Sequence, residues 1–123
     1  MNGISFWFVL SATVYVTIGM AWGIQMSVID NHLLSPAHAH LNLVGWVTMA
    51  LFGIYYHLVP QAAGAVLAKI HFTVATLGVW AMVPGIIQTL KDNGETLVKV
   101  GSMLTLASML IFLYTVFASR AKA

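Results

Sequence analysis

Four long apolar stretches, separated by short polar segments, make up almost the whole of this 123-residue chain. They cover residues 4–26, 38–60, 67–90 and 97–119. A bilayer core about 30 Å thick requires roughly 20 apolar residues per helical crossing, so each stretch is long enough to span. Only 7% of the residues are charged, far below the usage of soluble proteins. The sequence therefore predicts one domain, an all-α integral membrane four-helix bundle.

Helix-breaking residues mark the boundaries between the predicted spans. They are Asp30, Asn31, Ser35 and Pro36 after the first span, Pro60 and Gly64 after the second, and Lys91, Asp92, Asn93 and Gly94 after the third. Because the connections are short, we expect neighbouring helices to be antiparallel, in an up-down topology. The first span lacks a basic leading segment and a small-residue cleavage site, so we expect it to be retained as a helix.

The few charges predict an orientation. Lys69, Arg120 and Lys122 fall on one side, whereas the charges of the other side nearly cancel. Short loops rich in lysine and arginine stay in the cytoplasm, which predicts cytoplasmic termini and fits a bacterial inner membrane. The basic residues are not clustered, which disfavours nucleic-acid binding. The absence of cysteine excludes disulfides and thiolate metal ligands.

The histidines are the residues most able to carry chemistry in so apolar a chain. Residues two apart on a helix point about 200° apart, so His38 and His40 face opposite sides and cannot ligate one ion together. Each imidazole suits a haem iron or another transition metal. The alternative is that the pair hydrogen-bonds headgroups, water or carbonyls at the membrane interface.

Two further histidines lie toward the other end of the spans. His57 follows two tyrosines and is typical of an interfacial anchor. His71 begins the third span and could meet His57 across the second loop, which would make a rival bis-histidine site. About 25 Å of helix separates His40 from His57, so these two cannot share a ligand. The role of His32, near the outer end, is left open.

Small residues are spaced along the last three spans, which predicts close helix packing. They are Gly45, Gly53, Gly78, Gly85, Gly101, Ser102, Thr105 and Ser108.

The run Ala37-His38-Ala39-His40-Leu41, followed by Gly45, Gly53, Tyr56 and Leu58-Val59-Pro60, resembles helix ten of the haem-copper oxidase catalytic subunit. The cbb3-type oxidases and nitric oxide reductases are the most similar members. Lys69-Ile70-His71-Phe72, Leu77-Gly78-Val79 and Pro84 resemble helix eleven, and the segment from Gly101 is compatible with helix twelve.

This resemblance implies that His38 and His40 are axial haem ligands and that His57 and His71 are structural. The family's subunit has about twelve helices in three groups of four, and this chain corresponds to one group. Its copper-binding histidines and the opposite axial ligand of its low-spin haem have no counterpart here. Oxidase or nitric oxide reductase activity by this chain alone is therefore disfavoured.

Self-association would supply the missing ligand. In a ring of three copies, His38 of one protomer and His40 of its neighbour would clamp a haem b between them, and a two-fold dimer is the alternative. Saturated iron suits an electron carrier that exchanges electrons with a partner protein or a quinone. An open axial position would instead bind oxygen or nitric oxide. The remaining alternative is a cofactor-free module that helps to assemble a respiratory complex.

Overall fold

The computed structural model describes residues 1–120, and Lys122, which contributed to the predicted orientation, lies outside them. Helix α1 covers Gly3–Ile29, and α2 covers Ser35–His40. A π-helical segment, η1 (Leu41–Thr48), joins α2 directly to α3 (Met49–Leu58). A short turn of helix, α4 (Pro60–Ala63), leads to α5 (Val66–Leu90) and α6 (Thr96–Ala118).

The chain is all-helical over the described residues, and four of its helical stretches are long and apolar enough to cross a membrane. They are Gly3–Ile29, Ser35–Leu58, Val66–Leu90 and Thr96–Ala118. A helical stretch lies at each of the four predicted positions, with small shifts at the ends. The second stretch starts at Ser35, earlier than predicted, because Pro36 is favourable in the first turn of a helix.

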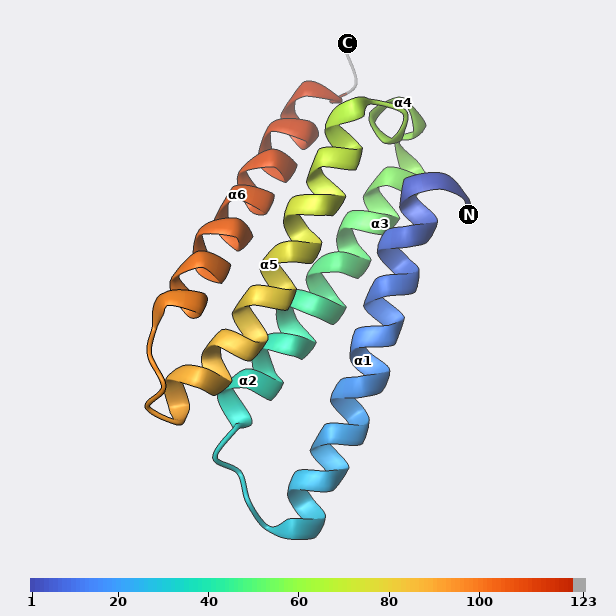
Figure 1. Cartoon of the computed structure of the whole chain (residues 1–123). Coiled ribbons are helices and arrows are strands. Elements are labelled where there is room, and N and C mark those ends of the chain that lie inside the picture. The colour runs from blue at the N-terminus through green and yellow to red at the C-terminus, as the bar shows by residue number, and fades with distance from the viewer. Residues whose placement is uncertain (121–123) are drawn as a thin grey trace.

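Both ends of the described chain lie at one end of the molecule, together with α4 (Figure 1). We call this the terminal end. The connections α1–α2 and α5–α6 lie at the opposite end, which we call the distal end (Figure 1). His38 and His40 are near the distal end, at the start of the second stretch, whereas His57 and His71 are near the terminal end.

The helices form two tightly packed hairpins. In the first, α1 packs along η1 and α3, and a Cβ atom added to Gly45 would lie 3.1 Å from the Tyr15 side chain. In the second, α5 and α6 approach even more closely. A Cβ on Gly101 would lie 2.5 Å from the backbone nitrogen of Met82, and one on Gly85 would lie 2.6 Å from that of Val98. The predicted role of these glycines in close packing is confirmed.

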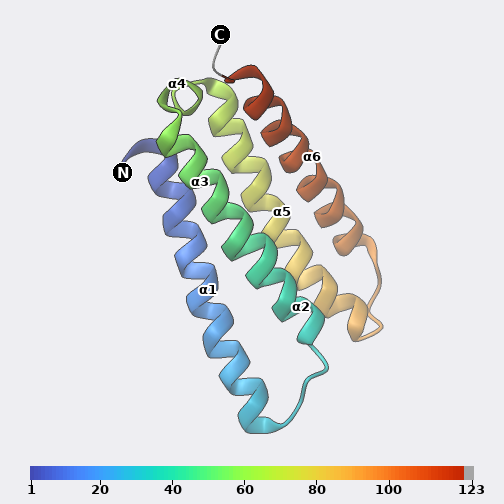
Figure 2. The same cartoon turned by 180° about the vertical axis from the view of Figure 1, so that it is seen from behind.

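Large side chains fill the space between the two hairpins near the terminal end. Rings from α1, α3, α5 and α6 meet there, namely those of Phe8, Phe52, Tyr56, His71, Phe72 and Phe112. Helices α1 and α6 lie at opposite edges of the molecule in both views (Figures 1 and 2). The last helix therefore does not return to pack beside the first, as it would in a closed ring of four helices.

Candidate functional site

His38 lies in the seam between α2 and α1. Its Nε2 atom is 2.9 Å from the carbonyl oxygen of Gly19 on α1, and its ring packs nearly perpendicular to that of Trp22, with ring centroids 5.8 Å apart. Gly23 leaves room for the imidazole, because a Cβ at this position would lie 3.2 Å from Nε2. In this chain the Nε2 atom of His38 is therefore engaged with the neighbouring helix.

His40 is held differently. Its Nδ1 atom donates to the carbonyl oxygen of Pro36, one turn earlier in the same helix, at 2.8 Å. Among residues 1–120 its Nε2 atom has no hydrogen-bond partner, and the side chain is half-buried. Metal-ligating histidines commonly donate one ring N–H to a carbonyl, which fixes the ring and leaves the other nitrogen for the metal. The free Nε2 of His40 has this arrangement.

The side chains of His38 and His40 point in different directions, as the helical geometry predicts. His38 faces α1, and His40 is turned away from that seam because it lies two residues farther along the helix. Within the described part of the chain, no group of three or more metal-ligating side chains comes together. An axial haem site needs only one or two ligands, so this observation does not bear on haem binding.

The helix changes its winding directly after His40. Over Leu41–Thr48 the backbone is π-helical, and the Thr48 hydroxyl donates to the Leu43 carbonyl five residues earlier, at 2.7 Å. Such segments are rare and are frequently found at functional sites. The sequence of this segment contains no feature that predicts a π-helix.

Asn42, within this π-helical segment, belongs to the same seam as His38. Its side-chain amide lies against Gly19, the residue whose carbonyl contacts His38, and its Oδ1 atom is buried without a hydrogen-bond partner in residues 1–120. A polar side chain within a membrane span is costly unless it is paired or functional. The seam therefore gathers His38, Asn42 and the Gly19 carbonyl, and sequence reasoning did not single out Asn42.

His71 is fully buried, and its Nδ1 atom is 2.8 Å from the hydroxyl of Tyr56. Its Nε2 atom is buried without a partner among the described residues. Rings of Phe8, Phe52 and Phe112 surround the imidazole, with centroid distances of 5.2, 4.4 and 5.9 Å. We call these three phenylalanines, with Tyr56, the His71 cage.

The position of His57 relative to the His71 cage tests the predicted bis-histidine site of His57 and His71. His57 is exposed at the end of α3 and is not part of the cage. The structure therefore does not bring His57 and His71 together. His32 is exposed in the α1–α2 connection, where its Nε2 is 3.7 Å from an Asp30 carboxylate oxygen.

No family model matches the chain, and no curated protein or solved structure matches it. The resemblance to haem-copper oxidases rests on the residues quoted for it above.

Proposed function

We propose that this chain is a haem b-binding electron carrier of the membrane, with the haem held between protomers near the distal end. The proposal rests on the hydrogen bonding of the two ring nitrogens of His40. Its Nδ1 is bound to the Pro36 carbonyl and its Nε2 is free, so the imidazole is already oriented to coordinate iron. Its position near the end of a span would place the haem within the membrane, close to the distal face.

His38 fits the second axial position only after a rearrangement. Its Nε2 would leave the Gly19 carbonyl and turn toward the haem of a neighbouring protomer. The net contribution of one hydrogen bond is about 1 kcal/mol, so a stronger bond to iron would outweigh it. Because His38 and His40 face opposite sides, each haem would take His38 from one protomer and His40 from the next.

A bound haem supplies a reversible one-electron couple at its iron. The protein would contribute the two imidazoles, their orientation, and an apolar surrounding that limits access of water. Saturation of both axial positions favours electron exchange with a partner protein or a quinone over activation of a gas.

The orientation of the chain in the membrane is part of the same proposal. We expect an antiparallel up-down crossing of a bacterial inner membrane, with the terminal end in the cytoplasm. Lys69 and Arg120 lie at the terminal end without an acidic residue near them in sequence, whereas the distal end carries Asp30, Lys91, Asp92, Glu95 and Lys99. This asymmetry agrees with the tendency of basic residues to remain inside.

One observation favours a second candidate function. The bond from His38 to the Gly19 carbonyl fastens α2 to α1, which is a structural role that needs no cofactor. Under that reading, the chain would be a haem-free module that supports the assembly of a larger membrane complex.

A reduced-minus-oxidised absorption spectrum of the detergent-purified protein separates the two candidates. Wild type, expressed with ample haem, is expected to give the sharp bands of a low-spin b-type haem. His40→Ala is expected to lose the bands or turn the iron high-spin, and His38→Ala is expected to do the same. His57→Ala is the matched control because His57 is exposed at the opposite end, and its spectrum should be unchanged. A wild-type protein without a Soret band would contradict the proposal and favour the haem-free module.

A further inference from the structure

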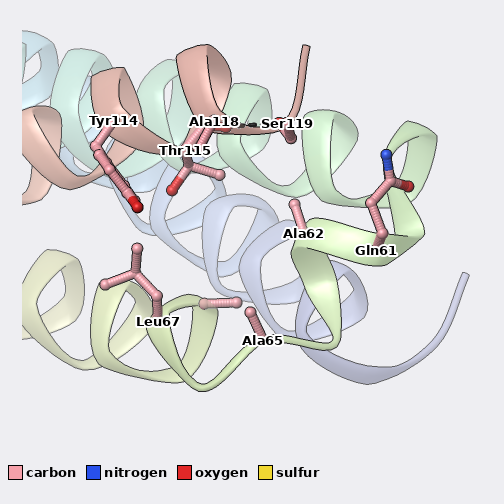
Figure 3. Close-up of a pocket in the computed structure, with 9 residues that line it drawn as sticks. Gln61, Ala62, Ala65, Leu67, Tyr114, Thr115, Ala118 and Ser119 are labelled. Atoms are coloured by element: carbon pink, nitrogen blue, oxygen red, sulfur yellow. Dashed lines mark hydrogen bonds between the residues drawn. The ribbon is translucent and has the colours of Figure 1, made fainter. Parts of the chain in front are cut away.

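A cleft of about 340 Å³ lies at the terminal end, between α4, the start of α5 and the end of α6. Ligand clefts in proteins typically have volumes of about 300–1,000 Å³. Figure 3 shows Tyr114 and Thr115 projecting from α6 toward Leu67 on the facing helix. In the same view, Gln61 and Ser119 lie at the other end of the cleft. That end is the outer one, because α4 and the last turn of α6 are at the terminal end, so the cleft runs inward along α6.

Small side chains form most of the walls of this cleft. They are the alanines Ala62, Ala65, Ala68 and Ala118. Ala65 and Ala118 are exposed, and Tyr114 is 62% exposed, so the cleft is open at the side of the bundle. At this level both α5 and α6 belong to predicted spans, and the open side therefore faces lipid. A gap that stays empty forfeits dispersion contacts, which makes its filling by a hydrocarbon chain favourable.

The polarity of the cleft changes along its length. The outer end carries the amide of Gln61 and the hydroxyl of Ser119, whereas Leu67 and Ala68 line the wall farther in. A phospholipid has the same gradient, because its glycerol and phosphate groups lie above its hydrocarbon chains. The shape and polarity of the cleft therefore suit one chain and the adjoining head group of a phospholipid.

Two basic residues flank the cleft. Lys69 directly follows Ala68, and Arg120 directly follows Ser119. Lysine and arginine side chains extend along apolar surface and place their charge at the membrane interface. The acidic residues of the chain all lie in or beside the distal connections, and they are Asp30, Asp92 and Glu95. The terminal end therefore carries positive charge that no acidic side chain of the protein offsets.

The guanidinium of Arg120 is held beside the cleft. It lies 4.1 Å from the centroid of the Phe117 ring, and its Nη1 atom donates to the Phe117 carbonyl oxygen at 2.7 Å. Phe117 is three residues from Tyr114 and therefore its neighbour on the surface of α6. Arg120 forms no ion pair within residues 1–120. Its remaining N–H groups form a planar fork that suits the oxygens of a phosphate.

We propose that this cleft binds an anionic phospholipid, with one hydrocarbon chain between α5 and α6 and the phosphate near Arg120 and Lys69. Basic pockets between spanning helices are a common type of site for anionic lipid head groups. The proposed lipid site is at the opposite end of the molecule from His38 and His40. It is independent of haem binding and of the side of the membrane that the terminal end faces.

Native mass spectrometry of the detergent-purified protein counts bound lipids directly. The protein is incubated with equal amounts of dioleoyl phosphatidylglycerol, which is anionic, and dioleoyl phosphatidylcholine, which is zwitterionic and has the same chains. Wild type is expected to retain phosphatidylglycerol at least about fivefold more often, because one basic residue near the membrane surface contributes about that factor. Equal retention of the two lipids would overturn the proposal.

Charge variants test whether the basic residues beside the cleft cause this preference. Arg120→Gln removes one charge and keeps a polar side chain, so the preference for phosphatidylglycerol should fall several-fold. The double variant with Lys69→Gln should retain both lipids about equally. Lys91→Gln is the matched control, because it removes the same charge at the distal end, and its preference should match that of wild type. An equal fall in Lys91→Gln would mean that net charge alone attracts the lipid, and the cleft would be wrong as the site.

A second pair of variants tests the cleft itself. Ala118→Trp places an indole in the cleft and should lower the retention of phosphatidylglycerol at least about fivefold by displacing its chain. Leu113→Trp adds the same ring to the lipid-facing side of α6, where Leu113 is 64% exposed, and should leave retention unchanged. Unchanged retention in Ala118→Trp would place the lipid elsewhere and contradict the proposal. If Ala118→Trp instead dissociated oligomers without loss of lipid, the cleft would be a contact between copies of the chain, which would also overturn it.

Discussion

At the scale of single residues, the hydrogen bond between Tyr56 and His71 is the most consequential contact that the structure adds. Tyr56→Phe removes the hydroxyl and leaves Nδ1 of His71 buried without that partner. An unpaired buried polar atom costs about 1–3 kcal/mol, so we expect a loss of that size in the free energy of unfolding. Reversible unfolding in mixed micelles, titrated with a denaturing detergent, measures it.

Tyr114→Phe is the matched control for that measurement. Tyr114 also lies in the terminal half of the molecule, but its side chain is 62% exposed. Removal of its hydroxyl should change the stability by less than about 0.5 kcal/mol. If both variants lost the same stability, the hydrogen bond would not be the cause, and the cage would owe its stability to ring packing alone.

Some properties of the histidines were predictable from local geometry, and others were not. The opposite directions of His38 and His40 follow from a rotation of about 100° per residue. The partner of His40 is also local, because Pro36 is one turn away. The contact of His38 with Gly19, in contrast, depends on how two helices dock, and no local pattern encodes that docking. His71 was expected to be structural, but its aromatic surroundings come from four helices and were not predictable.

At the scale of helices, the hairpin of α5 and α6 depends on glycine at the points where two backbones touch. Gly101→Ala would place a Cβ 2.5 Å from the backbone nitrogen of Met82, and backbone atoms cannot turn away as the end of a side chain can. We expect this overpacking to cost about 1–3 kcal/mol of stability, measured by the same unfolding titration. Gly85→Ala should behave in the same way, because Val98 approaches it at 2.6 Å.

Gly64→Ala is the control for these glycine variants. It lies between α4 and α5, where a Cβ would meet its nearest atom at 3.7 Å, an ordinary contact distance. Its φ angle of −79° is accessible to any residue. Its stability should therefore change little or rise slightly. A loss at Gly64→Ala equal to that at Gly101→Ala would mean that the α5–α6 backbone contact is not the source of the effect.

The helices themselves were largely predictable, because in lipid the length and hydropathy of a segment determine whether it spans as a helix. The π-helical winding of Leu41–Thr48 was not. Within this segment, Gly45 packs against Tyr15 of α1, and the composition of the segment does not predict such a contact between helices.

At the scale of the whole molecule, the proposed haem site is incomplete in one chain, since His38 and His40 face opposite sides. If each haem is shared between neighbours, two defective chains should complement each other. His38→Ala retains His40, and His40→Ala retains His38. Where the two variants meet in the correct order, one interface has both ligands. Coexpression of both variants, with different affinity tags, followed by sequential purification of mixed oligomers, creates such interfaces.

Each variant alone is expected to lack the low-spin spectrum, because every interface in its oligomer lacks one ligand. In unselected mixtures of equal amounts, each of the two protomers at an interface has a one-half chance of retaining the needed histidine, so about a quarter of the wild-type signal should return. Mixed oligomers selected through both tags should contain more. The haem signal of such oligomers should scale with the share of mixed interfaces. If the mixture gave no more signal than the sum of the separate variants, both ligands would have to come from one chain or from another protein, and the shared site would be wrong.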